Sequence, residues 1–399
     1  MKRKKIALLL TTLLIGNLVL TACNTAQTDS DSSSFENEDT FTSMDELSDT
    51  DFDFSSDDEV SVSQDGALYD GMGMDVFEYE EGCDNLNGKV ISITAYDMLD
   101  PALLLTSDNK VYSLNFDETT YLFDTVTDAT KLLDKTVECN VLTLNKDGSY
   151  TLYNEKDSSQ NHTFTTDHLM CAYTDCGYFT YFSLEDSYLQ IVSHEQNEAA
   201  PAAVPVQFNK APLLGKSSDD KVLTHEPIKN AVISTYCIDI LESNGEEYTA
   251  RIELAGHSAN KNGTVDFNTH PGHPYLKNVD EIYGSGIEYS SPIFSVIDDP
   301  ENLYTYEFDI LFSEETELLT MPMPEGYTTA DIKQIYENDD ILLCLTDGSV
   351  FFRDSAEPDY EWEFLEKVTE LNKEGHIIDF AISYDILALC DDMYLYELD

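Results

Sequence analysis

The chain has 399 residues, and its 78 acidic residues far outnumber its 21 Lys and Arg residues, which gives a formal net charge of −57 at pH 7. Nucleic acid is excluded as a partner, because affinity for phosphate backbones comes mainly from Lys and Arg. The charge favours basic proteins or divalent cations as partners, and its simplest role is to keep an exposed protein soluble.

Residues 1–22 have the layout of an export signal. A basic cluster at residues 2–5 precedes an uncharged stretch at residues 6–20, and a short step of small residues then leads to Cys23. This arrangement resembles the signal of bacterial lipoproteins, in which the peptide is cut before the cysteine and the thiol receives a diacylglyceryl group. The stretch is shorter than a membrane-spanning helix requires and contains Asn17. An ordinary secretory signal is the alternative, although Cys23 would then be a coincidence.

The resemblance implies that Cys23 is the lipid attachment site and the first residue of the mature protein. It also implies a location at the bacterial cell membrane, lipid-anchored on the extracytoplasmic face, so the membrane is a partner through the lipid. No later segment is apolar over the length of a spanning helix, so we expect none in the rest of the chain.

Residues 24–66 contain no Lys or Arg and consist largely of Ser, Thr, Asp and Glu. Such a segment cannot bury enough apolar surface to offset the entropy of ordering it. We therefore expect residues 23–66 to be a lipidated, disordered acidic linker that is extended by repulsion between like charges and spaces a folded domain from the membrane. Scattered aromatic residues such as Phe35 and Phe52 leave open a short partner-binding motif.

Residues 67–399 are long enough for one large domain or two ordinary ones. Short apolar runs alternate there with turns that contain Asp, Asn or Gly. Residues 102–116, 141–153 and 341–353 each join two such runs through an Asp-Asn or Asp-Gly turn, where residues that tolerate positive φ are required. These segments predict β-hairpins.

The hairpins form a repeat with a spacing of about 37 to 59 residues, which is typical of propeller blades with insertions. Blades stacked around an axis cover the apolar faces that a lone hairpin would expose. We therefore predict an all-β fold, a seven-bladed β-propeller over residues 67–399. Two domains with a boundary near residue 200 are the alternative. The predicted units begin near Val90, Leu132, Leu169, Ile228, Val279, Ile332 and Ile377.

The last two units, residues 332–353 and 377–398, resemble the repeats of the regulator of chromosome condensation family, whose members are seven-bladed propellers. The shared pattern is an I-x-x-I lead-in, a run that ends in an apolar-x-Leu step, a D-G turn and an aromatic strand. The Trp-Gly ending of that family is absent, and Trp362 is the only Trp in the chain. The resemblance implies a propeller but not nucleotide exchange or chromatin binding, because no functional residue of the family matches.

The sequence contains no G-x-S-x-G, no S-x-x-K and no phosphate-binding glycine loop, so we expect no enzymatic activity and no cofactor. His270 and His273, with His257 in reach, could ligate zinc, but a Pro-rich turn explains them more simply. Four adjacent acid pairs suggest calcium, although none lies in a calcium-binding loop, and we expect no metal site. These pairs begin at Asp219, Asp298, Asp339 and Asp391.

Seven cysteines remain besides Cys23, and their irregular spacing argues against a disulfide framework. Cys171 and Cys176 could pair across a turn. The others that lie in apolar strand-like runs are predicted to be free, buried thiols, and these are Cys139, Cys237, Cys344 and Cys390.

Two insertions, residues 194–227 and 255–278, flank the unit near Ile228 and are where a binding surface would grow. We predict a monomeric, non-catalytic module that binds a protein, a ligand or a cell-wall component. The alternative is an extracytoplasmic enzyme or solute receptor that uses the axial pocket of the propeller. A pocket with two or three converging ionisable groups would favour this alternative.

Overall fold

We describe a computed structural model of the protein. It describes residues 66–398, within the compact unit Ser61–Asp399. The exceptions are residues 80–82, 96–101, 115–118, 124–125, 137–139, 176–177, 187, 196–202, 210–226, 234–236, 246, 252–264, 269–277, 285–291, 307–317, 339, 355–359 and 383–385. The predicted signal peptide, the lipid attachment site and the acidic linker lie outside the described residues.

The described residues form seven β-sheets, and every strand pair but one is antiparallel. We number the sheets I to VII in chain order and call the strand named first in each sheet its first strand. Sheet VII is numbered from β26, although it also contains β1. Sheet I contains β2 (Val90–Ala95), β3 (Ala102–Thr106), β4 (Val111–Leu114) and β5 (Thr119–Phe123); sheet II contains β6 (Ala129–Leu133), β7 (Asn140–Asn145), β8 (Tyr150–Asn154) and β9 (His162–Phe164); sheet III contains β10 (Leu169–Asp175), β11 (Tyr178–Glu185), β12 (Tyr188–Glu195), β13 (Val204–Asn209) and β17 (Val265–Asn268).

The remaining sheets have three or four strands. Sheet IV contains β14 (Ile228–Ile233), β15 (Cys237–Glu242) and β16 (Glu247–Arg251); sheet V contains β18 (Val279–Tyr283), β19 (Ile293–Val296), β20 (Asp299–Tyr306) and β21 (Leu318–Pro322); sheet VI contains β22 (Ile332–Asn338), β23 (Asp340–Leu345), β24 (Val350–Arg353) and β25 (Glu363–Phe364); sheet VII contains β26 (Ile377–Ile382), β27 (Ile386–Cys390), β28 (Leu395–Leu398) and β1 (Met74–Val76). Helical segments of the described residues are η1 (Asp84–Leu86), η2 (Ser158–Gln160), η3 (Thr329–Asp331) and α2 (Glu366–Glu374).

The first strand of each sheet follows one sequence pattern, with two apolar residues three positions apart. In β2 these are Val90 and Ile93, both buried, and in β14 they are Ile228 and Ala231. Six of the seven predicted unit starts coincide with the first residue of such a strand. The exception is the second unit, which was predicted from Leu132, whereas the strand starts at Ala129, a smaller apolar residue that is equally buried.

Each first strand also carries a β-bulge at the same place, directly after its first apolar residue. A bulge inserts one residue into one strand of a pair and changes the direction of its side chain, and it is common beside binding sites. The seven sheets therefore repeat one local geometry on their innermost strands. The inserted residues are Ile91, Thr130, Met170, Lys229, Asp280, Lys333 and Ile378.

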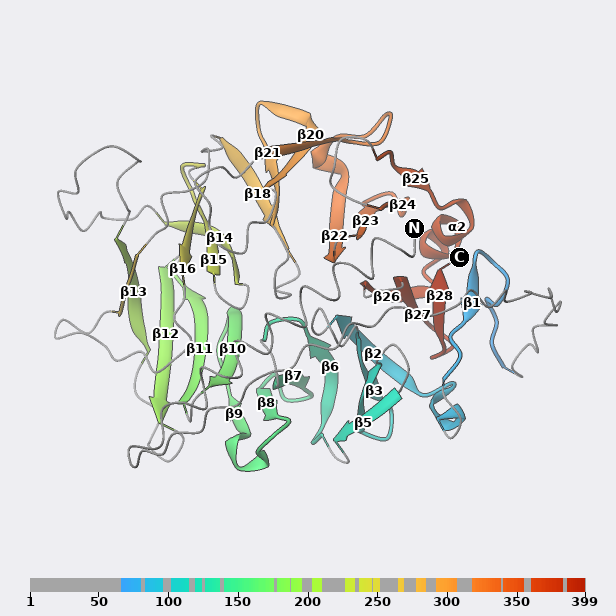
Figure 1. Cartoon of the computed structure of the whole chain (residues 1–399), viewed down its shortest axis with the longest axis horizontal. Coiled ribbons are helices and arrows are strands. Elements are labelled where there is room, and N and C mark those ends of the chain that lie inside the picture. Colours follow the sequence, from blue (N-terminus) through green and yellow to red (C-terminus); the bar gives the residue numbers. More distant parts are fainter. Residues whose placement is uncertain are drawn as a thin grey trace, which may run out of the picture. The chain divides into compact units, whose positions relative to one another are not determined.

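Consecutive sheets pack face to face through buried apolar clusters. Sheets I and II share one that includes Leu103 and Leu132, and similar clusters join sheets II to III, IV to V, V to VI and VI to VII. Sheets III and IV meet through β10 and β14, and another cluster returns from sheet VII to sheet I. Figure 1 shows the sheets following one another in chain order about a common centre. The predicted all-β fold is confirmed, and its arrangement is that of a β-propeller.

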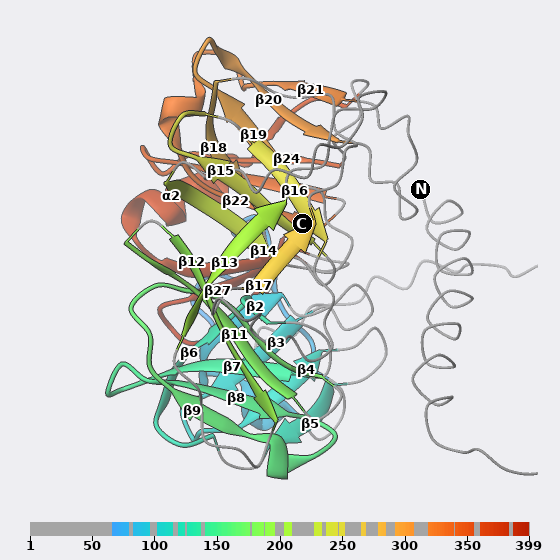
Figure 2. The same cartoon turned by 90° about the vertical axis from the view of Figure 1, so that its left-hand side faces the viewer.

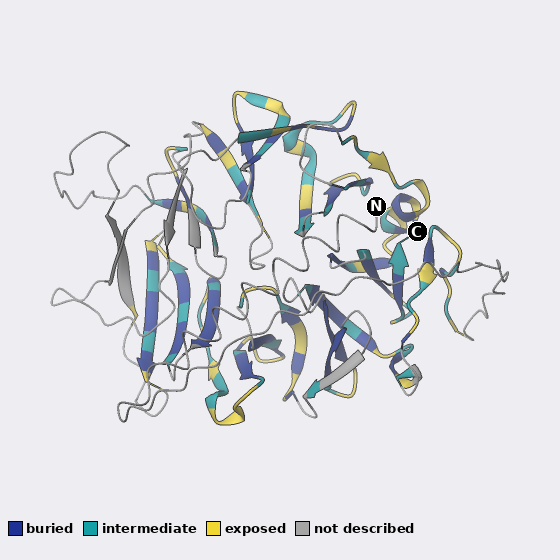
Figure 3. Cartoon of the chain, viewed as in Figure 1, coloured by how far each residue is buried: buried dark blue, intermediate teal, exposed yellow. Residues whose placement is uncertain are grey.

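The three predicted hairpins are confirmed as β3–β4, β7–β8 and β23–β24. Two of them turn through the same Asp-Gly-Ser sequence, in which Gly148 and Gly348 have φ values of 84° and 89°. In both turns the Ser N–H donates to the Asp side chain at 2.9 Å. The second strands of the sheets, such as β3 and β23, are buried along almost their whole length (Figure 3).

The two predicted insertions contribute strands as well as loops. β13 comes from the first insertion and β17 from the second, and they pair in parallel from Val206 opposite Val265 to Asn209 opposite Asn268 (Figure 2). This parallel pair extends sheet III beyond its four antiparallel strands. The structure therefore brings the two insertions together at the outer edge of one sheet.

The N-terminal end of the described chain completes the last sheet. β1 pairs with β28, with Met74 opposite Leu398 and Val76 opposite Tyr396. The segment before β1 is held by two acids of the β27–β28 turn: the Tyr69 hydroxyl donates to Asp391 at 2.7 Å, and the Leu68 N–H donates to Asp392 at 3.0 Å. The acid pair that suggested calcium in the sequence thus bonds to this closing segment.

The closing contacts are expected to weaken as the pH rises above neutrality. His376 Nδ1 lies 3.1 Å from Asp391 Oδ2, and its Nε2 lies 3.3 Å from Glu374 Oε2. The hydrogen bond to Asp391 raises the pKa of His376, and the hydrogen bond from Tyr69 lowers the pKa of Asp391. The stabilisation by His376 is therefore complete below the unfolded-state pKa of about 6.5 and is lost as the pH rises through the folded-state value.

Urea unfolding of the wild type and of His376→Gln tests this expectation. The wild type should have the higher midpoint at pH 5, where His376 is charged and Asp391, whose pKa is lowered, is ionised. The difference should shrink to nothing by about pH 9, where the imidazole is neutral. A difference that stays constant from pH 5 to pH 9 would show that packing against the ring of Tyr69, 5.1 Å away, is the only contribution.

Candidate functional site

Two cavities lie where the first strands of the sheets converge. The wide cavity, of about 610 Å³, is lined by residues of sheets II to VI, and the narrow cavity, of about 110 Å³, by residues of sheets I, II, VI and VII. Asp134, Gln334 and Tyr336 line both cavities. Since every sheet contributes to one or the other, the two cavities occupy the centre around which the sheets are arranged.

The bulges supply part of this lining. Met170, Lys229 and Lys333 are inserted residues at bulges, and all three line the wide cavity. The residues that follow the bulges in β6 and β26, Lys131 and Asp379, line the narrow cavity. The repeated bulge is thus the local geometry that places side chains at the centre of the fold.

The charge balance at the centre differs from that of the whole chain. Four lysines and four acidic residues line the two cavities, whereas the chain has 21 basic residues against 78 acidic ones. Cations are therefore enriched at the centre of a strongly anionic protein. The lysines are Lys131, Lys135, Lys229 and Lys333, and the acids are Asp134, Asp167, Glu337 and Asp379.

A polar network connects three sheets across the narrow cavity. Tyr336 of sheet VI donates its hydroxyl hydrogen to Asp379 Oδ1 of sheet VII at 2.8 Å, and Lys131 Nζ of sheet II lies 3.6 Å from Asp379 Oδ2. The Phe380 N–H also donates to Asp379, at 3.0 Å. Burial and the neighbouring Asp379 raise the pKa of Tyr336, so this phenol stays protonated and keeps its role as a donor.

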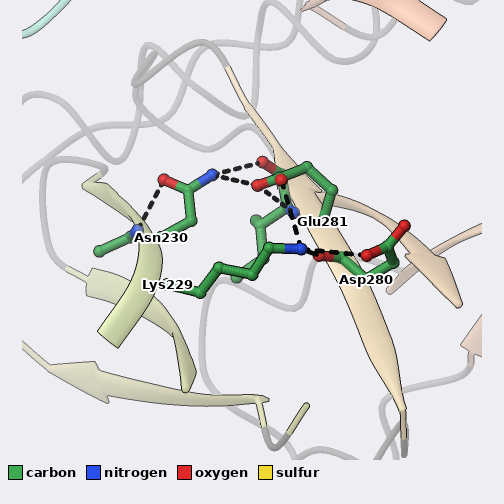
Figure 4. A network of polar contacts seen from close by, with 6 residues as sticks. Lys229, Asn230, Asp280 and Glu281 are labelled. Carbon is green, nitrogen blue, oxygen red and sulfur yellow. Dashed lines mark hydrogen bonds and ion pairs between the residues drawn. The ribbon is translucent and has the colours of Figure 1, made fainter. Parts of the chain in front are cut away.

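A second network joins sheets IV and V beside the wide cavity (Figure 4). Lys229 Nζ lies 3.0 Å from Asp280 Oδ1 and 3.7 Å from Glu281 Oε2, and it also donates to the carbonyl oxygen of Asp280. Asn230 Nδ2 donates to Glu281 Oε1 at 2.6 Å and to the Ile282 carbonyl at 3.1 Å. All four polar side chains belong to residues at the bulges of β14 and β18. The positive charge of Lys229 in sheet IV is therefore neutralised by carboxylates of sheet V.

Asp134 lies between the two cavities. Its side chain is exposed to the water that the cavities admit, but the protein packed around it raises the pKa of its carboxyl through desolvation. A carboxyl of this kind takes up a proton more readily than an ordinary aspartic acid.

Lys135 and Lys333 are the two lysines of the wide cavity that form no ion pair with a described carboxylate, although the neighbouring Asp134 interacts electrostatically with Lys135. Lys135 Nζ donates to the Leu169 carbonyl at 3.0 Å. Among the described residues, no carboxylate oxygen lies within 4.0 Å of the Nζ of either lysine. Lys333 is exposed to the cavity and forms no hydrogen bond with a described side chain or backbone group.

The positions of the lysines in the sequence are a signal for this site, although they form no known motif. Three of the four lysines occur one or two positions after the first apolar residue of a unit, in Ala129-Thr130-Lys131, Ile228-Lys229 and Ile332-Lys333. Strand periodicity alone assigns the positions one and two residues after the first apolar residue to opposite faces, and the bulge explains why lysines at both positions line the central cavities.

Among the described residues, none of the candidate metal-binding residues or cysteines named from the sequence lines the two cavities. Cys23, His257, His270 and His273 lie outside the described residues. Of the acid pairs, Asp298 accepts from Asn278 at 2.5 Å and Asp299 accepts from Asn302 at 2.9 Å, both near the β19–β20 turn. Within the described ranges no group of three His, Cys, Asp or Glu side chains could hold a metal ion.

The cysteines follow the sequence prediction where they are described. Cys344 and Cys390 are free and buried, and burial raises the pKa of each thiol to about 12. Cys171 is likewise a free, buried thiol. Cys139, Cys176 and the side chain of Cys237 are outside the described part. No helix in the described part of the chain is both long and apolar enough to span a membrane.

No protein-family model matches the sequence, and no curated protein matches it. Solved structures resemble the fold. The β-propeller domain of Cps50 (Swd1) from Myceliophteria thermophila has a TM-score of 0.43 and 8% identity, over 82% of this chain and 100% of its own. YCF48 from Cyanidioschyzon merolae has a TM-score of 0.39 and 9% identity, over 78% of this chain and 96% of its own. The computationally designed protein Ika8 has a TM-score of 0.35 and 8% identity, over 78% and 96%.

Proposed function

We propose that this chain is a bacterial lipoprotein, anchored through Cys23 on the extracytoplasmic face of the membrane, whose seven-bladed β-propeller binds a ligand at its centre without catalysis. The seven bulged first strands support the blade number, and the closure of sheet VII by β1 supports a complete ring. The lipoprotein-like signal supports the location.

The wide cavity is the observation that carries the binding role. Its volume of about 610 Å³ falls in the range of roughly 300–1,000 Å³ that is usual for small-molecule sites. Ionisable groups from several sheets converge on it. Such convergence favours a solute receptor, the alternative role predicted from the sequence. The centre of the propeller is therefore a better candidate than the loops of the two insertions.

A cavity-filling substitution tests this role. Gln334 lines both cavities and is exposed to them, so Gln334→Trp should fill the space where they meet. The matched control is Thr320→Trp, at an exposed position on β21, outside the lining of either cavity. We expect the wild type and the control to bind the same solutes from a mixed panel of anionic, neutral and cationic metabolites, as detected by saturation-transfer NMR.

The Gln334→Trp variant should bind the same solutes at least tenfold more weakly, because a ligand and the indole cannot occupy one space. Binding that is equal in all three proteins would place the ligand elsewhere. A panel in which no solute binds the wild type would contradict the receptor role.

Anchoring is tested separately, since Cys23→Ala should release the protein from the membrane fraction into the medium.

A further inference from the structure

The wide cavity contains two kinds of lysine. Lys229 is already neutralised by Asp280 and Glu281, and it serves to join two sheets. Lys135 and Lys333 form no ion pair within 4.0 Å among the described residues, and Asp134 interacts with Lys135 only from a greater distance. Two ammonium groups in one confined space repel each other, and an anion between them would remove this repulsion and form charge-assisted hydrogen bonds.

These two lysines reach the cavity from sheets that are not neighbours. Lys135 follows β6 of sheet II, and Lys333 is the inserted residue at the bulge of β22 in sheet VI. Sheets VII and I lie between them in the order of packing. An anion that contacts both lysines would bridge two sheets that are not neighbours, which favours a molecule with more than one negative group.

The rest of the lining suits an organic anion rather than a bare inorganic ion. Tyr150 and Tyr283 offer ring surface, and Leu184 and Ile282 add apolar surface to the same cavity. Two acids, Asp134 and Asp167, also line this cavity, and desolvation raises the pKa of Asp134. The volume of about 610 Å³ also exceeds what a single small ion occupies.

We propose that the wide cavity binds a small organic anion with two or more carboxylate or phosphate groups, held by the ammonium groups of Lys135 and Lys333. This inference rests on the proposed binding role and names the chemical class of its ligand. A protein with a net charge of −57 would need such local cations, because its overall field repels anions.

Isothermal titration of the full mature chain in detergent micelles tests the proposal, with citrate and fructose 1,6-bisphosphate as separate probes. Lys135→Met and Lys333→Met remove the charge and keep most of the side-chain length. The matched control is Lys146→Met, because Lys146 is an exposed lysine of the β7–β8 turn that lies 3.4 Å from Asp128. Lys333→Gln is a second variant with a polar side chain, in case Met at this site disturbs folding.

We expect at least one probe to bind the wild type, with about 10- to 100-fold loss of affinity in each single variant, because a hydrogen bond to a charged group contributes about 1.5–3 kcal/mol. The double variant should show no measurable binding, and Lys146→Met should stay within twofold of the wild type. Preference for citrate or for fructose 1,6-bisphosphate tells whether the groups recognised are carboxylates or phosphates.

Two results would overturn the proposal: equal binding of a probe by the wild type and the double variant, or no binding of either probe. The panel with Gln334→Trp separates this failure from that of the receptor role. If a neutral or cationic solute binds the wild type and is lost in Gln334→Trp but not in Lys333→Met, the cavity is a binding site and only its anion selectivity is wrong. If no solute depends on Gln334, both proposals fail.

Discussion

Replacing Met74 by Ala is expected to lower the free energy of unfolding by about 2–4 kcal/mol, the usual cost of removing a large buried side chain. Met74 is the first residue of β1 and is completely buried. It packs in the cluster that also contains Val368 of α2 and Ala388 of β27. The truncation therefore leaves a void at the place where the start of the described chain holds the last sheet.

Met72 is the matched control for this substitution. It lies two residues earlier in the same segment, but 42% of its surface is exposed. Met72→Ala should change the free energy of unfolding by no more than about 0.5 kcal/mol, as is usual for exposed positions. Urea unfolding followed by the fluorescence of Trp362, the only Trp, measures both variants. Equal effects of the two substitutions would mean that β1 does not stabilise sheet VII.

The second large effect is expected for Gly348→Ala, which should destabilise the protein by about 2–4 kcal/mol. Its φ of 89° already disfavours a side chain. A Cβ atom at this position would also lie 2.6 Å from Lys373 Cγ and 3.2 Å from Lys373 Cα. The second distance involves the backbone of α2, which is bound to the turn because Asn372 Nδ2 donates to the Gly348 carbonyl at 2.9 Å.

Gly148→Ala separates the cost of the positive φ from the cost of the contact with Lys373. Gly148 occupies the same Asp-Gly-Ser turn in sheet II with a φ of 84°, but a Cβ atom there would meet no atom within 4 Å. Its cost should therefore be the backbone strain alone, about 1–2 kcal/mol. The same urea titration gives both values. If Gly348→Ala cost no more than Gly148→Ala, the packing of α2 on the β23–β24 turn would be unimportant for stability.

The hairpins and the starts of the units could be predicted because their signals are local. An Asp-Gly turn specifies a positive φ at one residue, and two apolar residues three positions apart mark the start of each first strand. Ala129 was missed because a small residue gives a weak apolar signal beside Leu132. The helix α2 was also missed, since its nine residues are mostly polar and only Val368, Thr369 and Leu371 are buried.

The closing strand and the central site could not be predicted, because both depend on contacts between distant residues. β1 has only three residues, and the Tyr69 hydroxyl meets Asp391 across 322 positions of the chain. No local pattern records such a partner. Similarly, Lys135 and Lys333 are unremarkable in their own segments. They share a cavity only because a bulge turns one of them inward and the sheets bring their strands together.

The pairing of β1 with β28 has a consequence for biosynthesis. The ribosome makes β1 before any other described strand, yet its partner β28 is the last of the described strands to be made. The nascent chain must therefore keep β1 unpaired throughout translation, and a product that stops short of β28 exposes the edge of β27 instead. Closure of the last sheet thus requires that every other described strand has already been made.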